Sequence, residues 1–233
     1  MTVGQYAQAE QIRQMFDRVA PRYDARNRLF SLNRDQYWRR RAARRTALRP
    51  GQVAIDLCSG TGKLAHELLP YVRPNGRVIG IDFSTEMLTR ARQLEPEVDF
   101  RLGDVTHLSD AGQTVDAVTI AFGLRNLVDR EAVLQEAYRV LRAGGRFVIL
   151  EFSPPPRGPL MGLYRLYLHR LMPALAAIRD AGEADAYRYL AQSVEDFWPP
   201  KELTSRLERL GFSVSVEFMT LGIVAIHTAI RQH

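Results

Sequence analysis

Short runs of apolar, mostly branched residues alternate with stretches of helical spacing over most of the chain. The runs predict strands buried on both faces, at residues 53–57, 77–81, 98–102, 115–121 and 147–150. The stretches between them predict amphipathic helices over residues 63–71, 84–94 and 129–141. Ser84 and Asp129 are placed as N-caps, and the pair Gly144–Gly145 is expected to end the last of these helices. Strands and helices alternating in this way predict a doubly wound α/β fold.

The C-terminal part breaks the alternation. A helix is predicted over residues 203–210, followed by strands over 212–218 and 223–229. Only residues 219–222 separate these two strands, which is too short for a parallel crossover, so we expect an antiparallel hairpin. The complete prediction is a Rossmann-like, mostly parallel seven-stranded sheet that ends in an antiparallel C-terminal hairpin.

A chain of 233 residues suits one large α/β domain. Within it we expect four parts: an N-terminal helical cap (1–50), a sheet core (51–153), a helical insertion (154–200), and the C-terminal helix and hairpin (201–233). The cap is predicted to hold one helix ending before Pro21 and a second over residues 35–48. The second helix carries a dense group of arginines, Arg39, Arg40, Arg41, Arg44 and Arg45.

Composition excludes several classes of protein. Hydrophobic residues make up 46% and charged residues 25% of the chain, which is ordinary for a globular protein. Cys58 is the single cysteine, so an internal disulfide or a Cys-rich metal site is excluded. The five histidines lack metal-ligand spacing, and no metal site is expected. The sequence shows neither a charged-then-apolar leader nor an apolar stretch of membrane-spanning length, which favours a cytoplasmic setting.

The net charge is +6 and the sequence pI is near 9.8. Only Lys63 and Lys201 are lysines, so 32 − 2 leaves 30 arginines among the basic residues. Such a surface could attract nucleic acid or anionic lipid. A general preference for arginine would produce the same count without any partner, and a charged run is usually a solvated helix face.

A glycine loop follows the first predicted strand. Gly60, Thr61 and Gly62 form a tight turn into the next helix, which is the nucleotide-binding corner of a doubly wound sheet. The loop also satisfies the dinucleotide pattern, so glycines alone do not identify the ligand. Asp56, at the end of the strand, would repel a pyrophosphate and attract a cationic ligand such as S-adenosylmethionine. The alternative is that Asp56 only caps the loop backbone.

Two further carboxylates lie at the ends of neighbouring strands. Asp82 is placed to accept hydrogen bonds from ribose hydroxyls, and Asp104 to reach an adenine amino group with Val105 against the ring. Taken singly, either could be a helix cap or a loop carboxylate. Together with Asp56 they lie on one edge of the sheet, where such folds bind ligands. Gly103 and Ala121, at the ends of the third and fourth strands, complete the predicted cofactor set.

The chain resembles the menaquinone/ubiquinone C-methyltransferase family, a group of class I methyltransferases, from about Met15 to His227. Five segments carry the resemblance, namely Tyr23–Asn27 continuing through Ser31 to Trp38, Phe122–Asn126, Arg139–Ser153, Tyr187–Ala191 and Ile223–His227. The Phe122–Asn126 segment and the end of Arg139–Ser153 are specific, whereas the glycine loop is shared by all class I methyltransferases. The family usually has glycine and histidine where this chain has Asn33 and Asp35, and often methionine where Arg26 stands. Some members also have a small hydroxyl residue in place of Ala121.

The resemblance implies methyl transfer from S-adenosylmethionine to a ring carbon of a prenylated quinol. Demethylmenaquinol is the first candidate and the methoxy-polyprenyl-benzoquinol the second. Arg125 would stabilise the quinol oxyanion or hold a water, since its pKa is too high for a base. Asn126 would orient that water or the quinol oxygen, and Tyr23 would close over the cofactor or contact the ring. The alternative for Arg125 is a salt bridge that stabilises its loop.

The segment Leu160–Ile178 is apolar around most of a helix, which fits either core packing or a cover for a polyprenyl chain. Because such a substrate lies in the bilayer, the arginines of the cap could rest on anionic lipid. An RNA methyltransferase with a basic helix on phosphates is a competing hypothesis, but no aromatic stacking set accompanies the arginines. A nicotinamide-dependent dehydrogenase is disfavoured by Asp56 and the terminal hairpin. A non-catalytic adaptor on the same fold is disfavoured by the intact glycine loop.

Overall fold

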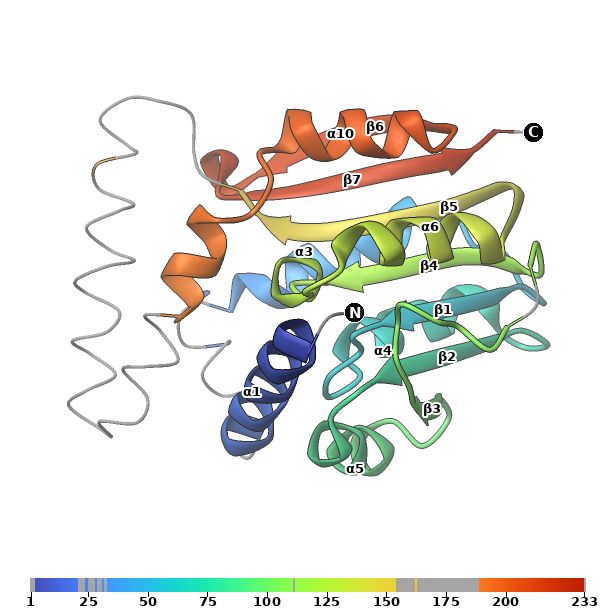
Figure 1. Ribbon diagram of the computed structural model, residues 1–233. Helices are drawn as coiled ribbons and strands as arrows, with labels where there is room; N and C mark the ends of the chain where they lie inside the picture. Colours follow the sequence, from blue (N-terminus) through green and yellow to red (C-terminus); the bar gives the residue numbers. More distant parts are fainter. Residues whose placement is uncertain are drawn as a thin grey trace.

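The structure is a computed structural model that describes residues 3–20, 24, 28, 31, 33–110, 112–153, 162 and 189–232. Within these residues seven strands form one sheet in the order β3-β2-β1-β4-β5-β7-β6 (Figure 1). The strands are β1 (Val53–Leu57), β2 (Arg77–Asp82), β3 (Asp99–Leu102), β4 (Val115–Ala121), β5 (Leu141–Phe152), β6 (Phe212–Met219) and β7 (Val224–Arg231). The first five pair in parallel, and β7 pairs antiparallel with both β5 and β6. The predicted fold class and the terminal hairpin are thereby confirmed.

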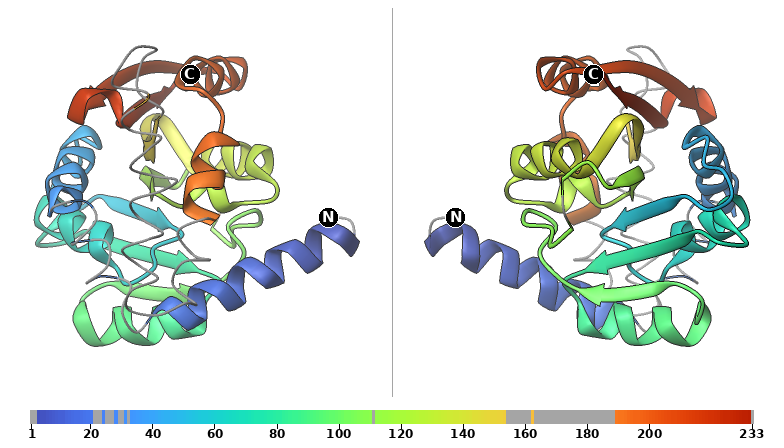
Figure 2. Two further views of the ribbon diagram at one scale, coloured as in Figure 1. Left: turned by 90° about the vertical axis from the view of Figure 1, so that its left-hand side faces the viewer. Right: turned by 90° about the vertical axis from the view of Figure 1, so that its right-hand side faces the viewer.

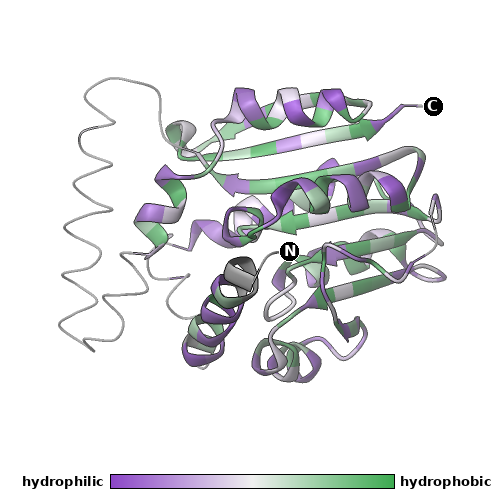
Figure 3. Ribbon diagram, in the orientation of Figure 1, coloured by the Kyte–Doolittle hydropathy of each residue, from purple (hydrophilic) through white to green (hydrophobic). Residues whose placement is uncertain are grey.

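Helices cover both faces of the sheet. Those with full bounds are α1 (Val3–Val19), α3 (Arg34–Arg45), α4 (Lys63–Val72), α5 (Thr85–Leu94), α6 (Arg130–Val140) and α10 (Pro200–Arg209), with short 3-10 turns η2 (Leu124–Asn126) and η4 (Thr220–Gly222). Side chains of α3, α4 and α5 share one core cluster with the sheet, and those of α6 and α10 share the other. Figure 1 shows α6 and α10 in front of the sheet and α3 behind it. Hydropathy follows this layering, with green strands inside and striped helices outside (Figure 3).

The two-residue period of the strands decides which side chains face which layer. On β1, Ala54 joins the α3 side of the core, whereas Ile55 and Leu57 join the α6 side. Asp56 therefore faces α3 and α4. It lies opposite Thr119 of β4 in the parallel register, so both polar side chains come together under the glycine loop.

Most element boundaries agree with the pattern, and Ser84 and Asp129 are N-caps as predicted, accepting from the N–H groups of Met87 and Ala132. The prediction for Gly144–Gly145 is wrong. Helix α6 ends at Val140, and β5 starts at once with Leu141 opposite Val115. Residues 142–145 then loop out before pairing resumes, because the register shifts at this point. The glycines therefore serve an irregular strand start, where Gly144 has a φ of +75°.

Helix α1 extends away from the sheet, and its C-terminal end lies near α5 (Figure 2). The Ser84 hydroxyl at the start of α5 donates a 2.5 Å hydrogen bond to Asp17 of α1. None of the described helices is both long and apolar enough to cross a bilayer. Tyr23, the helix predicted within 160–178 and most of the predicted insertion lie outside the described residues.

Candidate cofactor and substrate site

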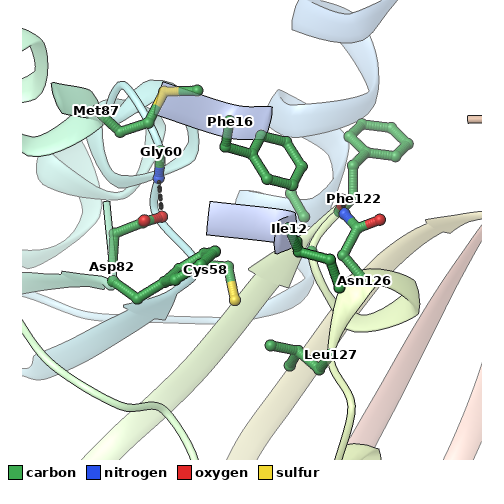
Figure 4. Close-up of a pocket in the computed structure, with 12 residues that line it drawn as sticks. Ile12, Phe16, Cys58, Gly60, Asp82, Met87, Phe122, Asn126 and Leu127 are labelled. Atoms are coloured by element: carbon green, nitrogen blue, oxygen red, sulfur yellow. Dashed lines mark hydrogen bonds between the residues drawn. The ribbon is translucent and has the colours of Figure 1, made fainter. Parts of the chain in front are cut away.

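A cavity of about 50 Å³ lies at the carboxyl edge of β1, β2 and β4 (Figure 4). This is the edge at which doubly wound sheets bind ligands. Twelve residues line it: Ile12, Phe16, Cys58, Gly60, Asp82, Phe83, Met87, Ala121, Phe122, Gly123, Asn126 and Leu127. Predicted cofactor residues and the predicted catalytic Asn126 therefore share one space.

Helix α1 closes this cavity from outside. Ile12 and Phe16 reach it from α1, on the side of Met87 and Asn126 (Figure 4). Asp17 of the same helix accepts a hydrogen bond from Ser84, which links α1 to the start of α5 beside this cavity.

The glycine loop needs its glycines for two different reasons. Gly60 has a φ of +55° and open space where a Cβ would point, and its N–H donates to Asp82 at 2.8 Å. Gly62 has a φ of +83°, and a Cβ there would lie 2.6 Å from the Phe100 ring. The first glycine leaves room beside the cavity, and the second allows the close packing of loop and sheet at the start of α4.

Thr61 is not among the described residues that line the cavity. Its hydroxyl is buried and donates to the Asp24 carboxylate at 2.9 Å. Lys63 lies 3.7 Å from the same carboxylate. Asp24 belongs to the first segment of the family resemblance, so the structure joins that segment to the glycine loop.

Asp82 is part of the cavity wall. Its carboxylate accepts from the backbone N–H groups of Gly60 and Ser84. Burial raises the pKa of this carboxyl, and the backbone donors act against that rise. Flanked by Phe83 and Met87, the carboxylate and the open side of Gly60 present one polar acceptor between apolar walls. An acceptor at the cavity wall is compatible with the ribose contact predicted for Asp82, which stays a prediction.

Asp56 lies beneath the loop rather than in the cavity wall. It is buried and accepts a 2.7 Å hydrogen bond from Thr119. Burial raises the pKa of the Asp56 carboxyl to about 7, although the hydrogen bonds from Thr119 and the Ala65 N–H and the nearby Arg39 guanidinium lower it. This geometry matches the loop-supporting alternative. Direct contact between Asp56 and a cation in this cavity does not follow from its position.

The residues after β3 also lie outside this cavity lining. Asp104 accepts from both the backbone N–H and the hydroxyl of Thr106, and Val105 is buried in the α6-side core. Gly103 donates its N–H to the Asp82 carbonyl. Four predicted cofactor residues follow or end β3 and β4, namely Gly103, Asp104, Val105 and Ala121. Of these, only Ala121, at the end of β4, lines the cavity. The predicted adenine contact by Asp104 and Val105 stays a prediction.

Arg125 is buried in a polar network of its own. Its Nη1 atom forms an ion pair with Glu151 at 2.8 Å and donates to the Phe122 carbonyl. Its Nε atom donates to Ser193, and the guanidinium lies over the Phe152 ring. The positive charge of Arg125 is therefore already paired within the protein, which corresponds to the salt-bridge alternative.

Asn126, in contrast, faces the cavity (Figure 4). Its Nδ2 donates to the Phe122 carbonyl at 3.2 Å, and its Oδ1 accepts from the Tyr189 hydroxyl at 3.3 Å. An amide has two N–H donors, so one remains beyond the bond to Phe122. Asn126 thus combines a held orientation with a free donor at the cavity.

Sequence reasoning missed the supports of these two residues. Tyr189, Ser193 and Arg130 reach the η2 turn from later segments, and Arg130 donates to the Arg125 carbonyl at 2.7 Å. Tyr189 lies in the segment Tyr187–Ala191 that carries part of the family resemblance, but no local pattern assigns these contacts. Burial raises the pKa of the Cys58 thiol well above the ordinary value. It lines the cavity as a neutral thiol.

Comparison with known proteins gives the family. Residues 4–231 match the ubiE/COQ5 methyltransferase family. A demethylmenaquinone methyltransferase of Thermus thermophilus is 44% identical over 93% of this chain and 100% of its own, and one of Streptomyces avermitilis is 42% identical over 96% of both chains. The family departures noted above do not prevent these matches.

Solved structures show the same fold at low identity. A methyltransferase of Haloferax volcanii, solved with the Trm112 activator, covers 94% of this chain with a TM-score of 0.65 at 17% identity. A SAM-dependent methyltransferase of Thermotoga maritima covers 95% of it, also with a TM-score of 0.65 and 17% identity. Family and fold support S-adenosylmethionine as the methyl donor, as the sequence predicts. The chain belongs to the ubiE/COQ5 methyltransferase family.

Proposed function

We propose that this protein methylates a ring carbon of demethylmenaquinol, with S-adenosylmethionine as donor. The observation that supports it most directly is the single cavity that joins the glycine loop to the held amide of Asn126. The demethylmenaquinone methyltransferases among its relatives favour the naphthoquinol over the methoxy-benzoquinol and over RNA. When bound, S-adenosylmethionine supplies a methyl group on a positively charged sulfur.

The ring carbon needs activation before it can accept the methyl group. A phenol ionises near pH 10, so ionisation of the quinol hydroxyl at neutrality requires a shift of about three pKa units, or roughly 4 kcal/mol. A few hydrogen bonds to the oxyanion in a dry site are of this magnitude. The protein must therefore place donors where the oxyanion forms.

We assign the oxyanion donor to the Nδ2 of Asn126. Tyr189 and the Phe122 carbonyl hold the amide of this cavity-lining residue, which leaves its second N–H for a ligand. Arg125 acts indirectly, because its Nη1 donates to the same Phe122 carbonyl to which Asn126 donates. The role predicted for Tyr23, closure over the cofactor or contact with the ring, remains part of the proposal.

The test uses purified protein with S-adenosylmethionine and a short-chain demethylmenaquinol, followed by mass spectrometry of the quinone. We expect addition of one methyl group to the ring, and slower or no reaction with the methoxy-benzoquinol. Asn126→Ala should lower kcat by roughly 10²- to 10³-fold, as for the loss of an oxyanion donor. Tyr189→Phe, which removes only the hydroxyl, should lower it less. Full activity of Asn126→Ala would remove the assignment, and absence of methylation by the wild type would remove the proposed substrate.

We further propose that the helix α3 side of the molecule rests on anionic lipid. Arg34 and Arg44 of this helix are exposed, with no ion-pair partner among the described residues. The η4 turn lies against α3 through the bond from Trp38 to Thr220, and its Leu221 is 73% exposed. Exposed arginines beside an exposed leucine suit a surface that meets anionic headgroups and the acyl boundary.

Flotation with vesicles of neutral and anionic lipid tests this surface. The wild type should float with anionic vesicles at low salt and lose that binding as salt rises. The double variant Arg34→Glu/Arg44→Glu should lose most of it. Arg209→Glu, on α10 at the opposite face, is the matched control and should keep it. Equal loss in the control, or no flotation of the wild type, would contradict the proposal.

A further inference from the structure

Arg39 is a buried cation with which no described residue forms an ion pair. Only 8% of the residue is exposed. Its Nε has no hydrogen-bond partner, and no ion pair to it occurs among the described residues. The guanidinium lies over the face of the Phe122 ring, whose centroid is 5.4 Å from the guanidinium carbon.

Burial of this kind is costly, and several other described arginines have a carboxylate partner. Arg125 is equally buried but is paired with Glu151. Arg41 and Arg45, on the same helix as Arg39, both donate to Glu217. A cation–π contact recovers less free energy than the dehydration of the ion costs. A buried guanidinium whose Nε has no hydrogen-bond partner is therefore suited to an anionic ligand.

The position of Arg39 indicates which ligand this is. The guanidinium stacks on Phe122, and Phe122 is part of the cavity wall. The positive charge of Arg39 lowers the pKa of the buried Asp56 carboxyl, although the two side chains form no ion pair. Arg39 thus lies close to the carboxylate beneath the glycine loop. The Phe122 ring also packs against Phe152, over which the paired Arg125 lies.

Arg39 and Asp56 place a positive and a negative side chain at one end of the site. Together they match the carboxylate and the ammonium of a free amino acid. The methionyl end of S-adenosylmethionine carries a carboxylate and an ammonium on one carbon. A guanidinium binds a carboxylate through two parallel hydrogen bonds, and such charge-assisted bonds are among the strongest in proteins. Asp56, when ionised, would favour the ammonium through its field.

We propose that Arg39 binds the carboxylate of the methionyl end of the methyl donor. The inference rests on the donor assigned above. It adds a binding residue that the glycine-loop pattern does not contain, supplied by helix α3. A quinol oxyanion has the same recognition chemistry, so the test must tell the two sources apart.

The experiment measures ligand affinity by calorimetry, independently of turnover. S-adenosylhomocysteine carries the methionyl-type carboxylate, whereas 5′-methylthioadenosine shares the nucleoside and lacks it. Arg39→Met should weaken S-adenosylhomocysteine binding by roughly 10- to 100-fold, the range for loss of charge-assisted hydrogen bonds. Affinity for 5′-methylthioadenosine should stay unchanged. Arg39→Lys should restore part of the loss.

Controls separate binding from packing. Arg40→Met removes the neighbouring exposed arginine, whose partner is Glu67, and should change neither affinity. The thermal midpoint of Arg39→Met should equal or exceed that of the wild type, because methionine removes an uncompensated buried charge while filling the space. If Arg39→Met does not fold, the Arg39→Lys variant carries the same comparison of the two ligands, because a shorter ammonium cannot form the bidentate bond.

Three outcomes would overturn the inference. Equal weakening of both ligands would show that Arg39 shapes the site through packing. Unchanged affinity for both, with a raised KM for the quinol, would assign the guanidinium to the quinol oxygen. If the wild-type protein binds neither adenosine ligand, the assignment of S-adenosylmethionine as the donor is itself wrong. This outcome differs from a failure of the Arg39 role alone, in which the wild type still binds both ligands.

Discussion

The buried pair of Arg125 and Glu151 leads to the sharpest prediction on stability. The two side chains are 7% and 2% exposed, and their closest atoms are 2.8 Å apart. Glu151→Gln keeps the shape and removes the negative charge, which leaves the guanidinium buried and uncompensated. Loss of one partner of a buried pair costs about 3 to 5 kcal/mol. We therefore expect the free energy of unfolding to fall by about that amount.

Urea unfolding followed by tryptophan fluorescence measures this change. A stability of 5 to 15 kcal/mol is usual for a domain, so a loss of about 3 to 5 kcal/mol shifts the midpoint strongly. The double variant Arg125→Met/Glu151→Leu removes both charges and should recover most of the loss, because a well-packed apolar pair often replaces a buried ion pair without cost. The matched surface control is Glu67→Gln, whose partner Arg40 is 60% exposed, with an expected change within about 1 kcal/mol.

The same variants separate stability from activity. The double variant should fold yet turn over slowly, because the Phe122 carbonyl loses the Nη1 donor that helps to fix the turn around Asn126. An unfolding midpoint for Glu151→Gln equal to that of the wild type would refute the reasoning, since it would mean that Arg125 has another counterion. Wild-type kcat in the double variant would refute the link to Asn126.

Three further predictions concern single residues. Burial lowers the pKa of His227 from 6.5 to about 4, and its Nε2 bonds the Pro200 carbonyl. Because the unfolded chain then binds the proton more tightly, wild-type stability should fall by about 3 kcal/mol as the pH drops from about 6.5 to about 4, and His227→Gln should lose that dependence in urea titrations. Gly62→Ala, strained at a positive φ and crowded by Phe100, should lose at least about 1 to 2 kcal/mol and weaken S-adenosylhomocysteine binding in calorimetry. Ser84→Ala removes an N-cap and should cost about 1 kcal/mol in thermal unfolding, while Ser84→Asn should keep most of the stability.

Chain geometry explains why the fold was predictable. Residues 219–222 are too few for a parallel crossover, and β6 and β7 pair antiparallel. The apolar runs mark strands because both faces of the sheet are covered, and period alone then decides which side chain faces which layer. The prediction for Gly144–Gly145 went wrong because glycine marks a helix end and a strand bulge equally well.

The site was predictable where the backbone alone determines it. Gly60 and Gly62 have positive φ values, which other residues rarely adopt, so the loop is visible in the sequence. The direction of a carboxylate is not visible in that way. Asp56 and Asp82 both end strands, but only Asp82 belongs to the cavity lining, because the partner of Asp56 is a threonine on the neighbouring strand. That contact joins residues 63 positions apart in the chain.

Two buried arginines show most clearly that the partner of a side chain is not visible in the sequence. Composition presents Arg39 and Arg125 as two members of a large basic set, yet both are buried against aromatic rings, Phe122 and Phe152, whose centroids lie 4.6 Å apart. The two arginines differ in their counterions. Glu151 forms an ion pair with Arg125, and no described residue forms one with Arg39. A buried ion pair can be replaced by apolar side chains at little cost in stability, so its charges serve structure alone. A buried cation without an ion pair gains its counterion only when a ligand binds, so its charge contributes to ligand affinity. The two variants should accordingly fail in opposite ways, Glu151→Gln in folding and Arg39→Met in binding.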